Sequence, residues 1–129
     1  MVREIYENEL GQLLELYLHL HEDSVPDFDE HLKNTWKTIV NDPNHHIIVK
    51  VVEGRIVSSC VCVVIPNLTR KIRPYAFVEN VVTHGDFRGK GNCFGLLQRL
   101  AESAEFVHLC RHAAACRQQK CCHQCRYDD

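Results

Sequence analysis

Apolar residues in the first third of the chain predict one strand and two helices. The short, partly apolar segment Val2–Tyr6 is typical of a strand. Apolar side chains then recur at the spacing of an amphipathic helix, at Leu10, Leu13, Leu14 and Tyr17. Pro26 separates this helix from a second one, which Asp27 or Asp29 can cap. The second helix should end at Asn41-Asp-Pro, because the residue before a proline disfavours helical geometry.

Beyond residue 46 the pattern changes to β-branched runs that predict a hairpin. Residues 47–52 form the first run and residues 56–65 form the second. Glu53-Gly54 between them predicts a tight reversal, so that the two strands pair in antiparallel fashion. A basic connection over residues 66–74 then leads to the next strand.

A glycine-rich turn separates the last predicted strand from the last predicted helix. The strand, Tyr75–His84, is apolar except at Glu79, Asn80 and its end, as in a strand buried on both faces. Four of the six glycines follow it, at Gly85, Gly89, Gly91 and Gly95. An apolar helical stripe begins after this turn and includes Leu96, Leu97 and Leu100. The predicted order is therefore strand, two helices, three strands, glycine-rich turn and helix.

Composition places these elements in one domain of ordinary globular type. The 129 residues are 45% apolar and 25% charged, enough to bury a single core. A formal net charge of −2 argues against nucleic-acid or membrane-surface binding by bulk electrostatics, so neither partner is expected. No apolar run approaches the roughly 18 residues of a membrane span, and the N-terminus lacks the apolar core of a signal peptide. We therefore expect a cytoplasmic protein whose eight cysteines are reduced.

The glycine-rich turn has the features of a phosphate-binding segment. Glycines let the backbone approach a ligand closely, while the free N–H groups and the dipole of a following helix favour an anion. The segment Arg88–Cys93 reads Arg-Gly-Lys-Gly-Asn-Cys, which is neither a P-loop nor a dinucleotide-binding Gly-x-Gly-x-x-Gly motif. The turn by itself therefore predicts an anion site without naming the ligand.

The run from Val78 to Gly91 closely resembles the acetyl-CoA-binding motif of the GNAT N-acetyltransferases. In that family the motif is a strand, then Arg/Gln-x-x-Gly-x-Gly/Ala, then a helix. The likeness covers about residues 1–105 and includes the order of the elements. It implies an α/β fold in which a mixed, mostly antiparallel sheet has helices on both faces.

The resemblance also implies an acetyl-CoA site made largely of backbone groups. The pyrophosphate would lie on the backbone N–H groups of consecutive residues, Arg88, Gly89, Lys90, Gly91, Asn92 and Cys93. Cys93 departs from the family, which has Gly or Ala at this position. Backbone groups of Val81, Val82 and Thr83 would pair with the pantetheine arm of acetyl-CoA like one more strand.

Acetyl transfer to a primary amine, by direct attack on acetyl-CoA, is the activity that the resemblance implies. A lysine-like amine has a pKa near 10.4, so its deprotonation at neutral pH costs roughly 4.6 kcal/mol. Glu79 is the expected general base, because many family members have a Glu near this position and burial would bring its pKa closer to neutrality. A backbone N–H near Val81 could stabilise the oxyanion. The acceptor, a small-molecule or peptide amine, stays open.

The C-terminal part of the chain departs from the family. The resemblance implies a further strand, a helix carrying a tyrosine acid and a closing hairpin, but residues 101–129 contain neither glycine nor proline. We therefore expect an incomplete GNAT-like domain over residues 1–109. A Cys/His-rich tail follows over residues 110–129, as a helical extension or a disordered segment. The missing strand would expose an edge of the sheet and favour self-association.

Two other functions stay open beside catalysis. Without the missing strands, the chain could bind acetyl-CoA and yet lack an acceptor site and the acid. The tail also contains soft metal ligands, with a zinc-knuckle-like step at Cys122-x-x-Cys125, although a full paired framework is missing. A truncated or frame-altered end explains this composition without a metal, so no metal site is predicted.

Overall fold

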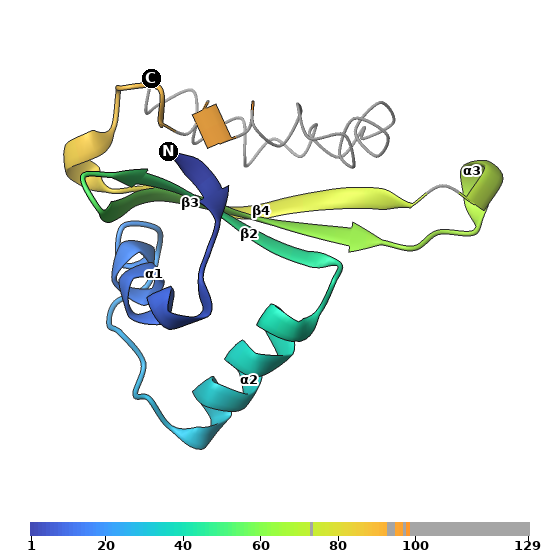
Figure 1. The fold of residues 1–129 in the computed structure, drawn as a ribbon, viewed down its shortest axis with the longest axis horizontal. Helices are drawn as coiled ribbons and strands as arrows, with labels where there is room; N and C mark the ends of the chain where they lie inside the picture. Colours follow the sequence, from blue (N-terminus) through green and yellow to red (C-terminus); the bar gives the residue numbers. More distant parts are fainter. Residues whose placement is uncertain (73, 93–94, 97, 99–129) are drawn as a thin grey trace.

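Four antiparallel strands form the sheet at the centre of the structure, in the order β1–β2–β3–β4 (Figure 1). The strands are β1 (Val2–Glu4), β2 (His45–Val52), β3 (Arg55–Ile65) and β4 (Tyr75–Thr83). This computed structural model describes residues 1–72, 74–92, 95, 96 and 98. Within these residues, the α/β class and the antiparallel pairing confirm the fold predicted from the sequence.

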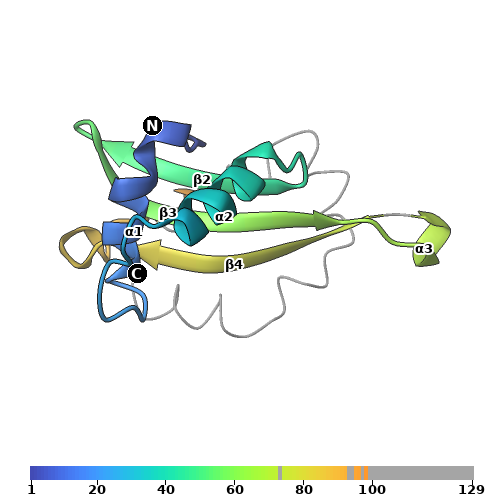
Figure 2. The ribbon, with the colours of Figure 1, turned by 90° about the horizontal axis from the view of Figure 1, so that it is seen from below.

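Two helices, α1 (Leu10–Tyr17) and α2 (Glu30–Asn41), cover one face of the sheet (Figure 2). Asp29 caps α2, because its Oδ1 accepts a hydrogen bond at 2.9 Å from a backbone N–H in the first turn of the helix. Trp36 fixes α2 to the sheet: its side chain is only 8% exposed, and its Nε1 donates to the backbone oxygen of Glu7 at 3.0 Å. Glu7 lies in a short 3-10 helix, η1 (Glu7–Glu9), between β1 and α1.

The two strand connections differ in how closely they follow the prediction. The β2–β3 hairpin turns at Glu53 and Gly54, as predicted, with φ angles of 51° and 76° that suit a two-residue hairpin turn. The predicted basic connection between β3 and β4 contains a short helix, α3 (Thr69–Ile72). Figure 1 shows α3 at the far end of a long β3–β4 arm, away from α1 and α2. Ile72 is exposed there.

Apolar side chains cluster on both faces of the sheet. The face under α1 and α2, here called the helix face, holds the buried residues Leu13, Leu16, Trp36, Ile47, Val49, Ile56, Val61 and Val82. The opposite face, here called the Leu96 face, holds Ile48, Cys60, Cys62, Ala76, Val81 and Leu96. Cys60 and Cys62 are both fully buried in this cluster. The segment after β4 therefore brings Leu96 onto the face that α1 and α2 leave open.

Several predictions about the C-terminal part fall outside the described residues. They are the boundary at residue 109, the Cys/His-rich tail with its metal-binding alternative, and the missing strands with the exposed sheet edge. Among the residues that the structure does describe, no helix has the length and apolar character needed to cross a bilayer.

Candidate functional site

The pairing of β3 with β4 is interrupted close to Glu79. The register pairs Glu79 with Val61 and then Val82 with Ser59, so β4 has two residues between these pairs where β3 has one. This arrangement is a β-bulge, which bends the bulged strand and leaves its extra residue outside the ladder. Asn80 lies at the bulge with φ 49°, a left-handed conformation that asparagine tolerates better than most residues. Sequence reasoning missed the bulge, although the polar Glu79-Asn80 step in an apolar strand was its signal.

The bulge changes which face each later residue of β4 contacts. Val81 packs in the cluster on the Leu96 face, and Val82 packs in the cluster on the helix face. Thr83 is also buried, and its hydroxyl lies 3.0 Å from the hydroxyl of Ser58. These three residues were predicted to hold the pantetheine arm. Their side chains are buried in the core. Only their backbone groups remain to contact a ligand. They lie along the edge of β4 away from β3, which has no strand partner among the described residues.

Glu79, the predicted general base, is exposed on the helix-face side of β4, where its register partner Val61 belongs to the helix-face cluster. The burial that this role requires is therefore not provided by the described residues alone. Tyr17 on α1 is a neighbour that sequence reasoning treated only as part of an apolar stripe. Burial raises the pKa of Tyr17 to about 12, with smaller contributions from Cys60 and Glu79. Its phenol therefore stays protonated at neutral pH.

The predicted pyrophosphate loop follows β4 through a short 3-10 helix, η2 (Gly85–Phe87). Gly89 and Gly91 have φ angles of 71° and 72°, in the left-handed region where glycine is favoured. The Asn92 side-chain amide donates to the backbone oxygen of Phe87 at 2.9 Å, which ties the two ends of the loop together. The N–H of residue 95 then donates to the oxygen of Gly91 at 3.0 Å, as in the first turn of a helix.

The loop leaves a row of backbone donors available. No hydrogen bond between described residues uses the backbone N–H groups of Gly89, Lys90, Gly91 and Asn92. Alternation of glycines at positive φ with ordinary residues allows successive N–H groups to form a concave anion site. Five of the six predicted pyrophosphate residues, Arg88 to Asn92, are thus brought together at the end of β4, whereas Cys93 lies outside the described residues.

The side chain of Arg88 forms hydrogen bonds to backbone groups outside the loop. Its Nε donates to the backbone oxygen of Thr83 at 3.2 Å, and its Nη2 donates to the backbone oxygen of His19 at 2.9 Å. The backbone N–H of Gly85 donates to Nδ1 of His19 at 3.2 Å. The imidazole of His84 stacks on that of His19, with 4.0 Å between ring centroids. The segment at the end of α1 is therefore in direct contact with the residues where the loop begins. No spacing in the sequence indicated this contact.

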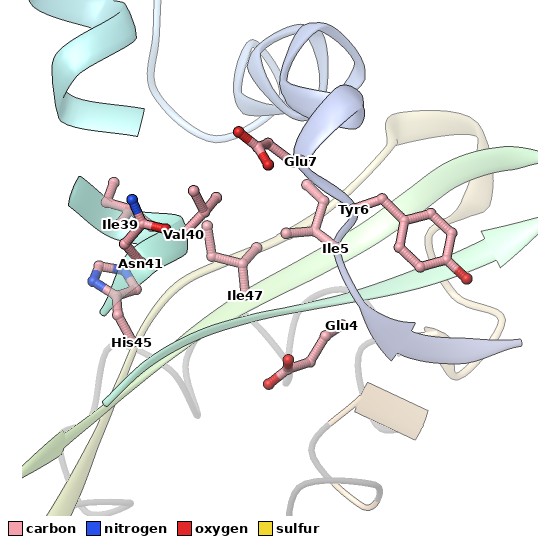
Figure 3. A pocket seen from close by; sticks show the side chains of 9 residues that line it. All are labelled: Glu4, Ile5, Tyr6, Glu7, Ile39, Val40, Asn41, His45 and Ile47. Atoms are coloured by element: carbon pink, nitrogen blue, oxygen red, sulfur yellow. The ribbon is translucent and has the colours of Figure 1, made fainter. Parts of the chain in front are cut away.

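A separate cavity of about 310 Å³ lies between the segment Glu4–Glu7 and the C-terminal end of α2 (Figure 3). Apolar side chains, among them Ile5, Val40 and Ile47, form its walls, and the carboxylates of Glu4 and Glu7 point in different directions. None of the predicted site residues lines this cavity. The described part of the chain also contains no group of three or more side chains that could hold a metal ion.

Comparisons with known proteins agree with the fold. The family model described as Acetyltransferase (GNAT) family matches residues 10–120, further than the residue 105 at which the likeness was expected to end. No curated protein sequence matches the chain.

Solved structures with the same fold cover most of the chain. A protein from Agrobacterium tumefaciens str. C58 named "Putative acetyltransferase" is 28% identical, with a TM-score of 0.78 over 98% of this chain and 91% of that one. An acetyltransferase from Trypanosoma brucei is 25% identical, with a TM-score of 0.69 over 84% and 77%. Glucosamine-6-phosphate N-acetyltransferase from Arabidopsis thaliana shares the fold at 21% identity, with a TM-score of 0.72 over 84% and 76%. With the family model matching most of its length, this chain belongs to the acetyltransferase (GNAT) family.

Proposed function

We propose that the chain transfers the acetyl group of acetyl-CoA to a primary amine by direct attack of the amine. Family membership supports acyl transfer to an amine. The observation that carries the proposal is the row of backbone N–H groups at Gly89–Asn92, which donate to no other described residue and directly follow a bulged strand. A diphosphate needs several donors of this kind, and glycines at positive φ favour their convergence.

The residues present fit acetyl-CoA along β4 as well as at the loop. When bound, acetyl-CoA supplies the activated acetyl thioester. The backbone of Val81–Thr83 would hold the pantetheine arm, because this edge of β4 has no strand partner among the described residues. The bulge lies just before these residues, and neither Asn80 nor Val81 has a register partner on β3. A backbone N–H at the bulge could therefore stabilise negative charge that develops on the thioester oxygen.

Glu79 would take the proton from the acceptor amine, directly or through a water. Removing this proton at neutral pH costs roughly 4.6 kcal/mol for a lysine-like amine, so a nearby carboxylate lowers a substantial part of the barrier. Glu79 is exposed, and a bound acceptor would supply the burial that raises the pKa of a general base. The hydroxyl of Tyr17, whose pKa burial raises to about 12, stays protonated at neutral pH.

Exposure of Glu79 also favours a second function, in which the chain binds acetyl-CoA without transferring the acetyl group. Calorimetric titration with acetyl-CoA and CoA, followed by CoA release across a panel of primary amines, separates the two functions. Saturable binding with CoA release supports the transferase, and binding without release on any amine selects the second function. No heat and no shift in melting temperature at about millimolar acetyl-CoA would refute both.

A further inference from the structure

A polar cavity of about 430 Å³ lies beside the predicted pyrophosphate loop and is lined by none of its residues from Gly85 to Asn92. Its walls come from α1 and the segment after it, from the start of β3, and from His84 at the end of β4. Polar side chains line much of it, namely Gln12, Glu15, His19, Arg55 and His84. Figure 1 shows these three parts of the fold meeting at the end of the molecule opposite α3.

His84 makes two contacts that a neutral imidazole cannot satisfy together. Its Nδ1 lies 3.1 Å from the backbone N–H of Asp86, and its Nε2 lies 2.9 Å from Nη2 of Arg55. A backbone amide and a guanidinium only donate, whereas a neutral imidazole has one acceptor nitrogen and one N–H. In either tautomer, one ring N–H therefore faces another N–H. Such a contact between two donors is relieved when one of the donors turns to a separate acceptor.

The other donors around His84 reinforce this reading. His19 accepts from the backbone N–H of Gly85 at its Nδ1, so the neutral ring carries its proton on Nε2. That Nε2–H has no hydrogen-bond partner among the described residues. Arg55 has one polar contact there, with Nε2 of His84, although its guanidinium has five N–H groups. With Nδ1 of His84 accepting from Asp86, two imidazole N–H groups and a guanidinium thus belong to residues that line the cavity.

The charged groups around His84 are of both signs: Arg55 and Arg88 are positive, and Asp86 and Glu15 are negative. Burial, followed by the charges of His19, Arg55 and Arg88, lowers the pKa of His84, so its ring is neutral at physiological pH. The carboxylate of Asp86 opposes these charges, but it is 3.9 Å from Nδ1 of His84 and 85% exposed. Glu15 lines the cavity from α1, not from the strand wall that carries Arg55 and His84.

We propose that this cavity binds a phosphate monoester, held by the guanidinium of Arg55 and by the Nε2–H groups of His19 and His84. A tetrahedral phosphate offers several acceptor oxygens to donors that approach from different elements, whereas a carboxylate offers two in one plane. Arg55 would donate to the phosphate and leave its contact with Nε2 of His84, and His84 would keep Nδ1 as the acceptor for Asp86. Two sources share this chemistry: the 3′-phosphate of a coenzyme A bound on the neighbouring loop, and a separate phosphorylated small molecule.

Titration of the full chain with inorganic phosphate, followed by ³¹P NMR and calorimetry, tests the site without acetyl-CoA. Saturable binding is expected. Arg55→Gln should weaken it by about tenfold or more, since a charge-assisted hydrogen bond is lost. Glu15→Gln should strengthen binding by removing a like charge, and Lys71→Gln, on the distant and exposed α3, should leave it unchanged. Absence of saturable binding, or equal affinity in the Arg55 and Lys71 variants, would overturn the proposal.

A second titration distinguishes the two sources and rests on the proposed acetyl-CoA site. If the 3′-phosphate of coenzyme A is the ligand, Arg55→Gln weakens coenzyme A binding and leaves 3′-dephospho-CoA binding unchanged. If a separate molecule is the ligand, inorganic phosphate still binds when coenzyme A is saturating, and only phosphate responds to Arg55→Gln. Phosphate binding without any coenzyme A binding would support the cavity and refute the transferase.

Discussion

Replacing Gly91 by valine tests the predicted pyrophosphate loop directly, because the expected ligands are backbone N–H groups and not side chains. Gly91 has φ 72°, where a β-branched residue is a genuine outlier. A Cβ at this position meets no atom of a described residue within 4 Å, so the substitution is expected to act through backbone conformation and not through a Cβ clash. Leaving valine in this region would cost about 1–2 kcal/mol, and the loop relieves that cost by changing its conformation.

Two other glycines provide matched controls. Gly54 has φ 76° and the same open space around a Cβ, but it lies in the β2–β3 turn. Gly54→Val should therefore lower the free energy of unfolding by about 1–2 kcal/mol without touching the loop. Gly11 lies in α1 with open space and no positive φ, so Gly11→Val should change stability by no more than about 0.5 kcal/mol.

Urea unfolding followed by circular dichroism gives the stabilities, and calorimetric titration gives the acetyl-CoA affinities. All three variants should fold, and the variant at Gly91 alone should bind acetyl-CoA about tenfold or more weakly, because its N–H groups turn away from a common centre. If Gly91→Val binds acetyl-CoA as tightly as Gly54→Val does, the loop does not hold the pyrophosphate and the reasoning fails.

Three further substitutions test separate parts of the structure. Glu79→Gln should flatten the alkaline rise in acetyl-transfer rate, since glutamine cannot take the amine proton; an unchanged pH–rate profile would exclude the base role. Trp36→Phe should lower the free energy of unfolding by about 1–3 kcal/mol, because the ring is smaller and the backbone oxygen of Glu7 loses its donor; circular dichroism is the measurement, since Trp36 is the only tryptophan. The Arg3 hydrogen bond lowers the pKa of Glu9 below its ordinary 4.5, so the pair stabilises the fold above that pH and the contribution is lost as pH falls through the lowered value. Glu9→Gln should therefore cost about 1 kcal/mol at pH 7 and little once the pH is below the lowered pKa, and a loss that does not change with pH would contradict this assignment.

Local chemistry explains the parts of the fold that the sequence predicts well. Asp29 can cap a helix through its own carboxylate, and Glu53-Gly54 can form a hairpin turn through its own φ angles. Both signals lie within a few residues and need no knowledge of distant partners. Gly89 and Gly91 give a local signal of the same kind, because glycine favours the left-handed geometry that both adopt.

Contacts between distant elements explain what the sequence does not predict. His19 and His84 are 65 positions apart in the sequence. Their stacking requires the end of α1 to reach the end of β4, and Arg55 joins them only because the β2–β3 turn lies at the same end of the sheet. The residues of the proposed phosphate cavity are therefore brought together only by the arrangement of α1, β3 and β4 in the fold.

The bulge at Asn80 links the two sites that we propose at this end of β4. Side chains of a regular strand alternate, so with Glu79 on the helix-face side an unbulged β4 would direct His84 to the Leu96 face. The extra residue reverses the alternation, as the positions of Val81 and Val82 in opposite clusters show. His84 can therefore stack on His19 of the helix layer, and the loop that follows leaves the sheet from that contact. One left-handed residue in β4 thus both interrupts the ladder where acetyl-CoA would bind and brings His84 to the phosphate cavity.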